Sequence, residues 1–196
     1  MILIWSLQVG GADQEQGILA KDLIQYKANI KEAVDNGVFI LIICGAYQLF
    51  GKYYKGVEGN IIPGLEIFPY YTEAINDRKK RCIGNTVISA NLNGKETKII
   101  GFENHGGQTF DVDTPFGNVL FGYGNKFGDS KEGFFLTNVI ATYLHGPLLS
   151  KNPELADYII KYCLDRKYSE DIILEPLNDE FENKCREQLL DRFLNS

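Results

Sequence analysis

Short apolar runs alternate with a longer amphipathic segment over the first fifty residues. Met1 to Leu7 and Val38 to Ile43 are almost continuously apolar, as expected of strands buried on both faces of a parallel sheet. Between them, apolar residues recur at steps of three and four from Leu19 to Ala33, which predicts one helix ending near Gly37. This order of strand, helix and strand predicts an α/β domain with a mostly parallel sheet.

A cysteine lies where the second apolar run meets the next helix. Ala46 to Phe50 suit the start of a helix, so Cys44 and Gly45 occupy a strand-to-helix turn. Such a turn holds a nucleophile above the sheet edge, and the free N–H groups of the helix favour a thiolate or an oxyanion. A free cysteine after a buried strand is more often a small core residue, and from this stretch alone that interpretation is favoured.

The rest of the chain adds antiparallel strands and two helices. Asn93-Gly94 between two apolar stretches, Thr86 to Leu92 and Lys95 to Phe102, is a strong hairpin signal. No repeat, low-complexity segment or linker divides the chain, so residues 1–196 are expected to form one domain. The other expected elements are strands at Leu65 to Tyr71, Gly117 to Tyr123 and Phe134 to Leu144, a loop at Phe102 to Gly107, and helices opening at Asn152-Pro153 and Asp179-Glu180.

Composition narrows the function classes. The net charge of -6 and the pI near 5.0 argue against a nucleic-acid surface. The four cysteines are widely spaced, which fits a reducing cytoplasm and neither a zinc site nor a disulfide framework. No apolar run approaches the roughly 20 residues of a membrane span, and the start of the chain lacks a secretory signal. We therefore expect a cytoplasmic protein with no metal, cofactor, nucleic acid or membrane span.

A cysteine nucleophile needs a base, because a thiol with a pKa of about 8.5 is mostly protonated at neutral pH. The sequence has two histidines. His145 follows a predicted buried strand, as Cys44 does, and the carboxyl ends of parallel strands meet at one edge of a sheet. His145 is therefore the better candidate base, whereas His105, in a predicted loop, is better explained as a hydrogen-bonded structural residue.

A cysteine with a histidine fits acyl transfer, in which backbone N–H groups hold the oxyanion. Gly45, directly after the cysteine, and Gly11, in the glycine loop after the first strand, are candidate donors. A tight turn explains these glycines equally well.

Five segments, in order, carry a family resemblance. Ile43 to Gln48 (ICGAYQ) resembles the nucleophile turn of class I glutamine amidotransferases, and Ala141 to Pro147 (ATYLHGP) resembles the histidine segment of their cobyric-acid-synthase-type branch. Gly10 to Gln16, Gly101 to Gly107 and Phe121 to Asn125 resemble, more specifically, the glutaminase subunits of lipid II isoglutaminyl synthases. The similarity runs along nearly the whole chain, and it implies a flavodoxin-like sheet flanked by helices with an antiparallel hairpin extension.

The resemblance implies that Cys44 is the nucleophile, His145 the general base and Arg78 the arginine that binds glutamine, although Arg78 alone reads equally as a surface charge. It also implies hydrolysis of L-glutamine, with ammonia passed to a Mur-ligase-like partner in a heterodimer that amidates the stem-peptide glutamate of lipid II in peptidoglycan synthesis. No phosphate-binding loop is present, so ATP chemistry is assigned to that partner. The alternatives are amidation of a corrinoid carboxylate and a catalytically dead binding module.

The chain departs from the family pattern at four places. Val9 and Ala46 stand where most members have glycine, which changes loop geometry without removing a reacting group. Pro147 stands where many class I enzymes have the glutamate that orients the histidine, and the resemblance implies that an aspartate of the partner replaces it. The family's first strand, helix and second strand have no counterpart before Met1, so an exposed face or edge of the sheet is expected.

Overall fold

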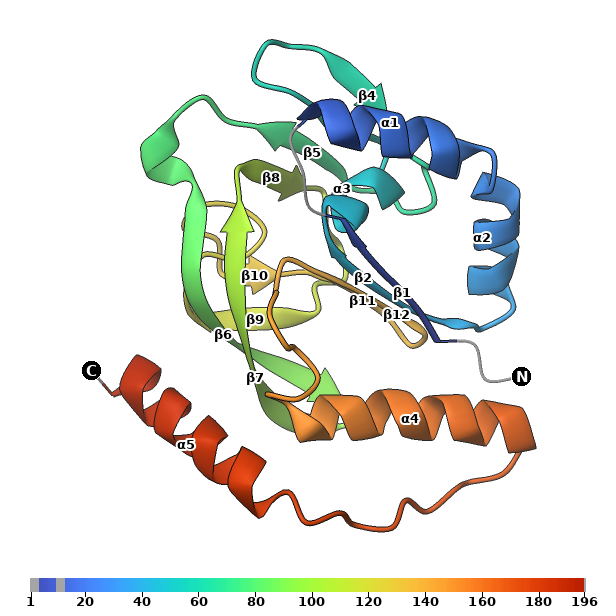
Figure 1. Ribbon diagram of the computed structural model, residues 1–196, viewed down its shortest axis with the longest axis vertical. Coiled ribbons are helices and arrows are strands. Elements are labelled where there is room, and N and C mark those ends of the chain that lie inside the picture. Colours follow the sequence, from blue (N-terminus) through green and yellow to red (C-terminus); the bar gives the residue numbers. More distant parts are fainter. Residues whose placement is uncertain (1–3, 10–12, 196) are drawn as a thin grey trace.

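The computed structural model describes residues 4–9 and 13–195, whose strands form three four-stranded sheets (Figure 1). The central sheet has the order β1 (Ile4–Val9), β2 (Phe39–Cys44), β12 (Val139–Thr142), β11 (Phe134–Leu136). The second has the order β10 (Lys131–Glu132), β9 (Gly117–Phe121), β6 (Cys82–Leu92), β7 (Lys95–His105), and the third β4 (Ile61–Pro63), β3 (Tyr53–Lys55), β5 (Tyr71–Ala74), β8 (Gly107–Phe110). The helices are α1 (Asp13–Ile24), α2 (Lys27–Asp35), α3 (Gly45–Phe50), α4 (Pro153–Tyr168) and α5 (Glu180–Leu194), with a 3₁₀ turn η1 (Arg78–Lys80).

The central sheet confirms the predicted α/β core. β2 pairs in parallel with β1 on one side and with β12 on the other, and all six of its residues are buried. β11 pairs with β12 in the antiparallel direction, and the other two sheets are largely antiparallel. Parallel pairing is therefore limited to β1, β2 and β12 of the central sheet and to β3 with β5 of the third sheet. The antiparallel extension is larger than the one hairpin that the sequence predicts.

The single helix expected between the first two strands is two helices. α1 ends at Ile24, and α2 begins at Lys27 after a turn in which the Tyr26 N–H donates to the carbonyl of Leu23. Leu23 and Ile30 are buried, but Tyr26 is 53% exposed. Leu23 and Ile30 keep a helical spacing across the break, so the apolar pattern gives no sign of it. Tyr26, which the pattern places on the buried face, lies in the turn and is exposed.

The prediction of a strand from Leu65 to Tyr71 is wrong for every residue except Tyr71. Residues 65–70 are irregular, and β5 begins at Tyr71. The Leu65 N–H donates to the carbonyl of Leu49, and the N–H groups of Ile67 and Phe68 donate to the carbonyl of Phe50. These carbonyls end α3 and have no helical partner, so the segment caps this helix instead of pairing with a strand.

The expected strand from Phe134 to Leu144 is instead a hairpin. β11 and β12 pair with each other through Leu136 and Val139, and Asn138 lies in the turn between them. The Asn138 side chain donates to the carbonyls of Val34 and Val38, which fixes the turn against the end of α2.

The hairpin at Asn93-Gly94 is confirmed and is longer than expected. Asn93 (φ 51°) and Gly94 (φ 84°) both have positive φ, as a tight two-residue hairpin turn requires. The pairing of β6 with β7 continues from Leu92–Lys95 to Cys82–His105. The loop expected at Phe102 to Gly107 is therefore wrong, because its residues up to His105 complete β7.

The two C-terminal helices begin where the sequence predicts. α4 and α5 lie along the lower side of the molecule in Figure 1, below the sheets. Asn152, which precedes α4, is fully buried, and its side chain bonds the N–H and carbonyl of Ile100 and the carbonyl of Leu148. This asparagine therefore ties the start of α4 to β7.

Within residues 4–9 and 13–195, no helix has the length and apolar character needed to cross a membrane.

Candidate active site

Cys44 occupies a strained turn between β2 and α3. It is the last residue of the strand and the residue that caps the helix, with φ 57° and ψ -114°. A side chain other than glycine in such a conformation costs about 1 to 3 kcal/mol and persists only where the surrounding structure imposes it. Here a fully buried strand leads directly into a fully buried helix, and the turn has the form of a nucleophile elbow.

The Cys44 side chain is protonated at neutral pH. The residue is 8% exposed, and this burial raises the pKa of the thiol to about 11. The Gly45 N–H, which hydrogen-bonds the sulfur, and the positive charge of Arg81 act in the opposite direction and lower that pKa. The sulfur therefore needs a base that removes its proton during the reaction.

His145 leaves the central sheet at the same edge as Cys44. β12 runs parallel to β2, and Thr142 is paired with Ile43, so both strands end there. The backbone of His145 is held by β7: its N–H donates to the carbonyl of Phe102 at 2.7 Å, and its carbonyl accepts from the Phe102 N–H at 3.3 Å. The parallel pairing thus carries the cysteine and the histidine chosen from the sequence to the same edge of the central sheet.

The His145 ring has the properties of a base in its resting state. Burial lowers the pKa of His145, so its imidazole is neutral at pH 7. Its Nε2 atom is buried and has no hydrogen-bond partner among the residues that the structure describes. No carboxylate of those residues hydrogen-bonds this ring, and Pro147, two residues further on, has none to offer.

A buried carboxyl group fixes the backbone that leads to His145. Glu132 is fully buried, and it accepts from the Tyr143 N–H at 2.7 Å and contacts the hydroxyl of Thr142 at 2.9 Å. Burial, with the nearby carboxyl of Glu103, raises the pKa of Glu132 to about 8. The Thr142 hydroxyl donates to the Glu132 carboxyl, and this bond and that from the Tyr143 N–H act in the opposite direction and lower its pKa. Sequence reasoning missed this residue, because a lone glutamate before an apolar strand carries no signal.

His105 fits the structural role expected from the sequence. It is 3% exposed, its Nδ1 lies 2.7 Å from the carbonyl of Gly107, and its ring stacks on Tyr143 with the centroids 3.6 Å apart. Burial lowers the pKa of His105 to about 4. Because a carbonyl only accepts, the proton lies on Nδ1, and the ring is a neutral spacer behind the segment that carries His145.

The other predicted site residues are Gly45, Gly11 and Arg78, and the structure describes two of them. Gly45 is the first residue of α3, with its N–H directed at the sulfur. Gly11 lies outside the described residues. Arg78 begins η1 and is exposed, and its side chain makes no hydrogen bond or ion pair with the described part of the chain. Arg81, at the end of the same turn, is the arginine whose charge reaches Cys44, and no sequence signal separated it from Arg78.

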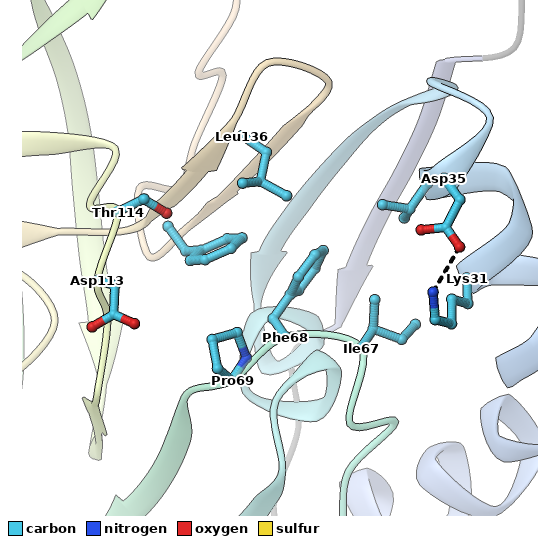
Figure 2. A pocket seen from close by; sticks show the side chains of 10 residues that line it. Lys31, Asp35, Ile67, Phe68, Pro69, Asp113, Thr114 and Leu136 are labelled. Atoms are coloured by element: carbon cyan, nitrogen blue, oxygen red, sulfur yellow. Dashed lines mark hydrogen bonds and ion pairs between the residues drawn. The ribbon is translucent and has the colours of Figure 1, made fainter.

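An apolar pocket lies away from Cys44 and His145. A cavity of about 370 Å³ lies between α2, residues 67–69 and β11, and Figure 2 shows Phe68 and Pro69 at its floor with the Lys31–Asp35 ion pair beside it. Neither Cys44 nor His145 lines it. Among the described residues, no group of three or more His, Cys, Asp or Glu side chains is arranged to hold a metal ion.

Known proteins match most of this chain in sequence. Residues 7–153 match the CobB/CobQ-like glutamine amidotransferase domain. The lipid II isoglutaminyl synthase (glutamine-hydrolyzing) subunit GatD of Staphylococcus aureus (strain N315) is 41% identical over 185 residues, which cover 93% of this chain and 72% of the relative. The subunit of the same name from Streptococcus pneumoniae (strain ATCC BAA-255 / R6) is 39% identical, covering 93% of this chain and 69% of the relative.

Two further matches are more distant. A probable cobyric acid synthase of Methanococcus vannielii is 31% identical over 82% of this chain but only 32% of its own length. A solved structure of a glutamine amidotransferase superposes with a TM-score of 0.54 at 15% identity, covering 82% of this chain and 77% of that one, which supports the fold.

Both histidines should titrate below the usual imidazole pKa in the isolated chain. Because burial disfavours the imidazolium, the pKa of His145 should lie below its usual 6.5, and that of His105 near 4. Nitrogen-resolved NMR of the imidazoles measures both, and His145→Gln identifies the signal that remains as His105. A His145 pKa at or above 6.5 would mean that a carboxylate of this chain faces the ring.

Glu132 should make the fold less stable as the pH rises. Its pKa is about 8 in the folded chain and ordinarily 4.5, so the folded state binds the proton more tightly and loses stability between about pH 4.5 and 8. In Glu132→Gln, whose amide does not titrate, the free energy of unfolding should fall less over this range. Urea unfolding at several pH values tests this, with exposed Glu58→Gln as the matched control that keeps the wild-type slope. Identical slopes for wild type and Glu132→Gln would contradict it.

Proposed function

Because the chain belongs to the CobB/CobQ-like glutamine amidotransferase family, we propose that it is the glutaminase subunit of a lipid II isoglutaminyl synthase. In this proposal it hydrolyses L-glutamine to glutamate and ammonia. A Mur-ligase-like subunit, bound to it as a heterodimer, uses ATP and the ammonia to amidate the stem-peptide glutamate of lipid II. The observation that carries the proposal is the strained Cys44 at the sheet edge where the neutral His145 also lies.

The proposed reaction begins with proton transfer between two neutral groups. Nε2 of His145 takes the proton of the Cys44 thiol as the sulfur attacks the side-chain carbonyl carbon of glutamine. The resulting oxyanion accepts hydrogen bonds from the Gly45 N–H and, by resemblance, from that of Gly11. The imidazolium then returns the proton to the leaving nitrogen, and ammonia departs from a γ-glutamyl thioester.

Hydrolysis of the thioester completes the cycle. His145 removes a proton from water as the water oxygen attacks the thioester carbon. The second tetrahedral intermediate then collapses with cleavage of the C–S bond, and the imidazolium returns its proton to the leaving sulfur, which releases glutamate and regenerates the Cys44 thiol. Arg78 is proposed to bind the substrate, because a guanidinium group without a partner in the described chain can take a carboxylate with two parallel hydrogen bonds.

Three further features bear on the proposal and its alternatives. The described cysteines are all free thiols, which fits a reducing cytoplasm. The GatD relatives are matched over about 70% of their length, whereas the cobyric acid synthase is matched over 32%, so amidation of a corrinoid is less well supported. A dead binding module is disfavoured because the cysteine and the histidine are both present.

Cys44→Ala should abolish glutamine-dependent synthesis by the assembled complex and leave synthesis from free ammonium salts unchanged. The reason is that the thiol makes ammonia while the ligase chemistry belongs to the partner. The measurement is product formation with each nitrogen source in turn. The exposed Cys185 provides the matched control, since Cys185→Ala should retain both activities. Loss of both activities in Cys44→Ala would contradict the division of labour.

The isolated chain should be a slow glutaminase that its partner accelerates. His145 lacks a carboxylate partner in the described chain, and without one its imidazolium is less well stabilised during attack. We propose that an aspartate of the partner subunit supplies this carboxylate. The test compares glutaminase kcat of the chain alone, with the partner, and with the partner's aspartate changed to asparagine. Full activity of the chain alone would contradict the proposal.

A further inference from the structure

The asparagine that precedes α4 does not use its side chain as a helix cap. Asn152 occupies the capping position, where an asparagine ordinarily accepts a hydrogen bond from an N–H of the first helical turn, but its side chain makes no such bond. Its backbone carbonyl begins the helix instead, accepting from the N–H groups of Leu155 at 2.9 Å and Ala156 at 3.2 Å. The side-chain amide of this fully buried residue is therefore engaged elsewhere.

That amide joins two segments of the chain. The Asn152 oxygen accepts from the Ile100 N–H at 2.8 Å, and the nitrogen donates to the carbonyls of Ile100 at 2.8 Å and of Leu148 at 2.7 Å. Because an N–H only donates and a carbonyl only accepts, these partners allow one orientation of the amide. Ile100 and Leu148 are both buried, so removal of the amide would deprive three backbone groups in the interior of a hydrogen bond.

Both segments meet at the candidate base. On β7, Ile100 lies two residues from Phe102, whose N–H and carbonyl are bonded to the backbone of His145. On the other segment, Leu148 lies three residues after His145. The bridge between Phe102 and His145 is an isolated pair, and one of its two bonds is 3.3 Å long. Asn152 supplies a second attachment between the same two stretches of backbone.

The chain before His145 is fixed by different groups. The buried carboxyl of Glu132 accepts from the Tyr143 N–H at 2.7 Å, and the Thr142 hydroxyl accepts from the Leu144 N–H at 3.0 Å. These bonds anchor the segment that leads to the base, whereas the asparagine amide anchors the loop that follows it. The histidine is therefore held from both sides.

We infer that Asn152 is a positioning residue for the reaction: its amide clamps the loop after His145 to β7 and so holds the imidazole in place for proton transfer with Cys44. This inference rests on the proposed function, in which His145 takes the thiol proton. It assigns Asn152 no contact with the substrate.

Asn152→Asp separates this role from helix capping. Aspartate caps helices as well as asparagine does, but it has at most one donor for the carbonyls of Ile100 and Leu148. In the assembled complex, kcat for glutamine hydrolysis should fall about 10- to 100-fold, since misplacing a catalytic group by about 1 Å can cost roughly 100-fold. The KM for glutamine should be unchanged. Asn152→Ser, which also keeps a capping side chain, should give the same result and replaces the aspartate variant if that one does not fold.

Asn138 provides the matched control. Its side-chain amide also donates to two backbone carbonyls, those of Val34 and Val38, but it lies at the opposite end of β12 from His145. Asn138→Asp should lower the free energy of unfolding in urea and leave kcat unchanged. An equal fall of kcat in Asn138→Asp, or an unchanged kcat in a folded Asn152 variant, would overturn the inference.

A second measurement does not depend on glutamine. When the loop is no longer clamped, the His145 ring becomes more exposed, and its pKa should rise toward the usual 6.5. Nitrogen-resolved NMR of the isolated chain measures this pKa, which should keep its wild-type value in Asn138→Asp. A wild-type complex without glutaminase activity would contradict the proposed function, whereas the same His145 pKa in wild type and Asn152→Ser would overturn the inference itself.

Discussion

The parallel pairing of β2 with its two neighbours is the constraint on which the rest of the site depends. A strand buried on both faces ends directly in a helix, and this forces Cys44 into a backbone conformation that only strong packing maintains. The same pairing brings β12 to the edge where His145 emerges. The antiparallel hairpin then adds the outer wall, because β7 holds the histidine backbone and the base of the hairpin carries Arg81.

The buried groups around this edge share one electrostatic property. Burial raises the pKa of Cys44, Glu103 and Glu132 and lowers that of His145, so each is displaced toward its neutral form. A resting site of neutral groups avoids the cost of buried unpaired charge. In the proposed reaction, charge separation occurs only when the thiol proton moves to the imidazole.

Local sequence patterns predicted the elements whose structure is decided locally. The run from Val38 to Ile43, the turn at Asn93-Gly94 and the start of α4 depend on burial, positive φ and proline geometry, all of which can be read from neighbouring residues. Residues 65–70 could not be predicted as a helix cap, because their partners are carbonyls of α3. Arg81 was missed for the same reason: its position is set by the pairing of Cys82 with His105, a long-range contact that leaves no local signal.

His145 belongs to two sheets at once. Its chain arrives from β12 of the central sheet, but its N–H and carbonyl are bonded to Phe102 on β7, the edge strand of a different sheet. A small separation of those sheets would therefore move the base away from the sulfur while each sheet kept its own internal hydrogen bonds. The distance between the thiol and the imidazole therefore depends on how the two sheets pack against each other. Catalysis at Cys44 would be lost before either sheet unfolds.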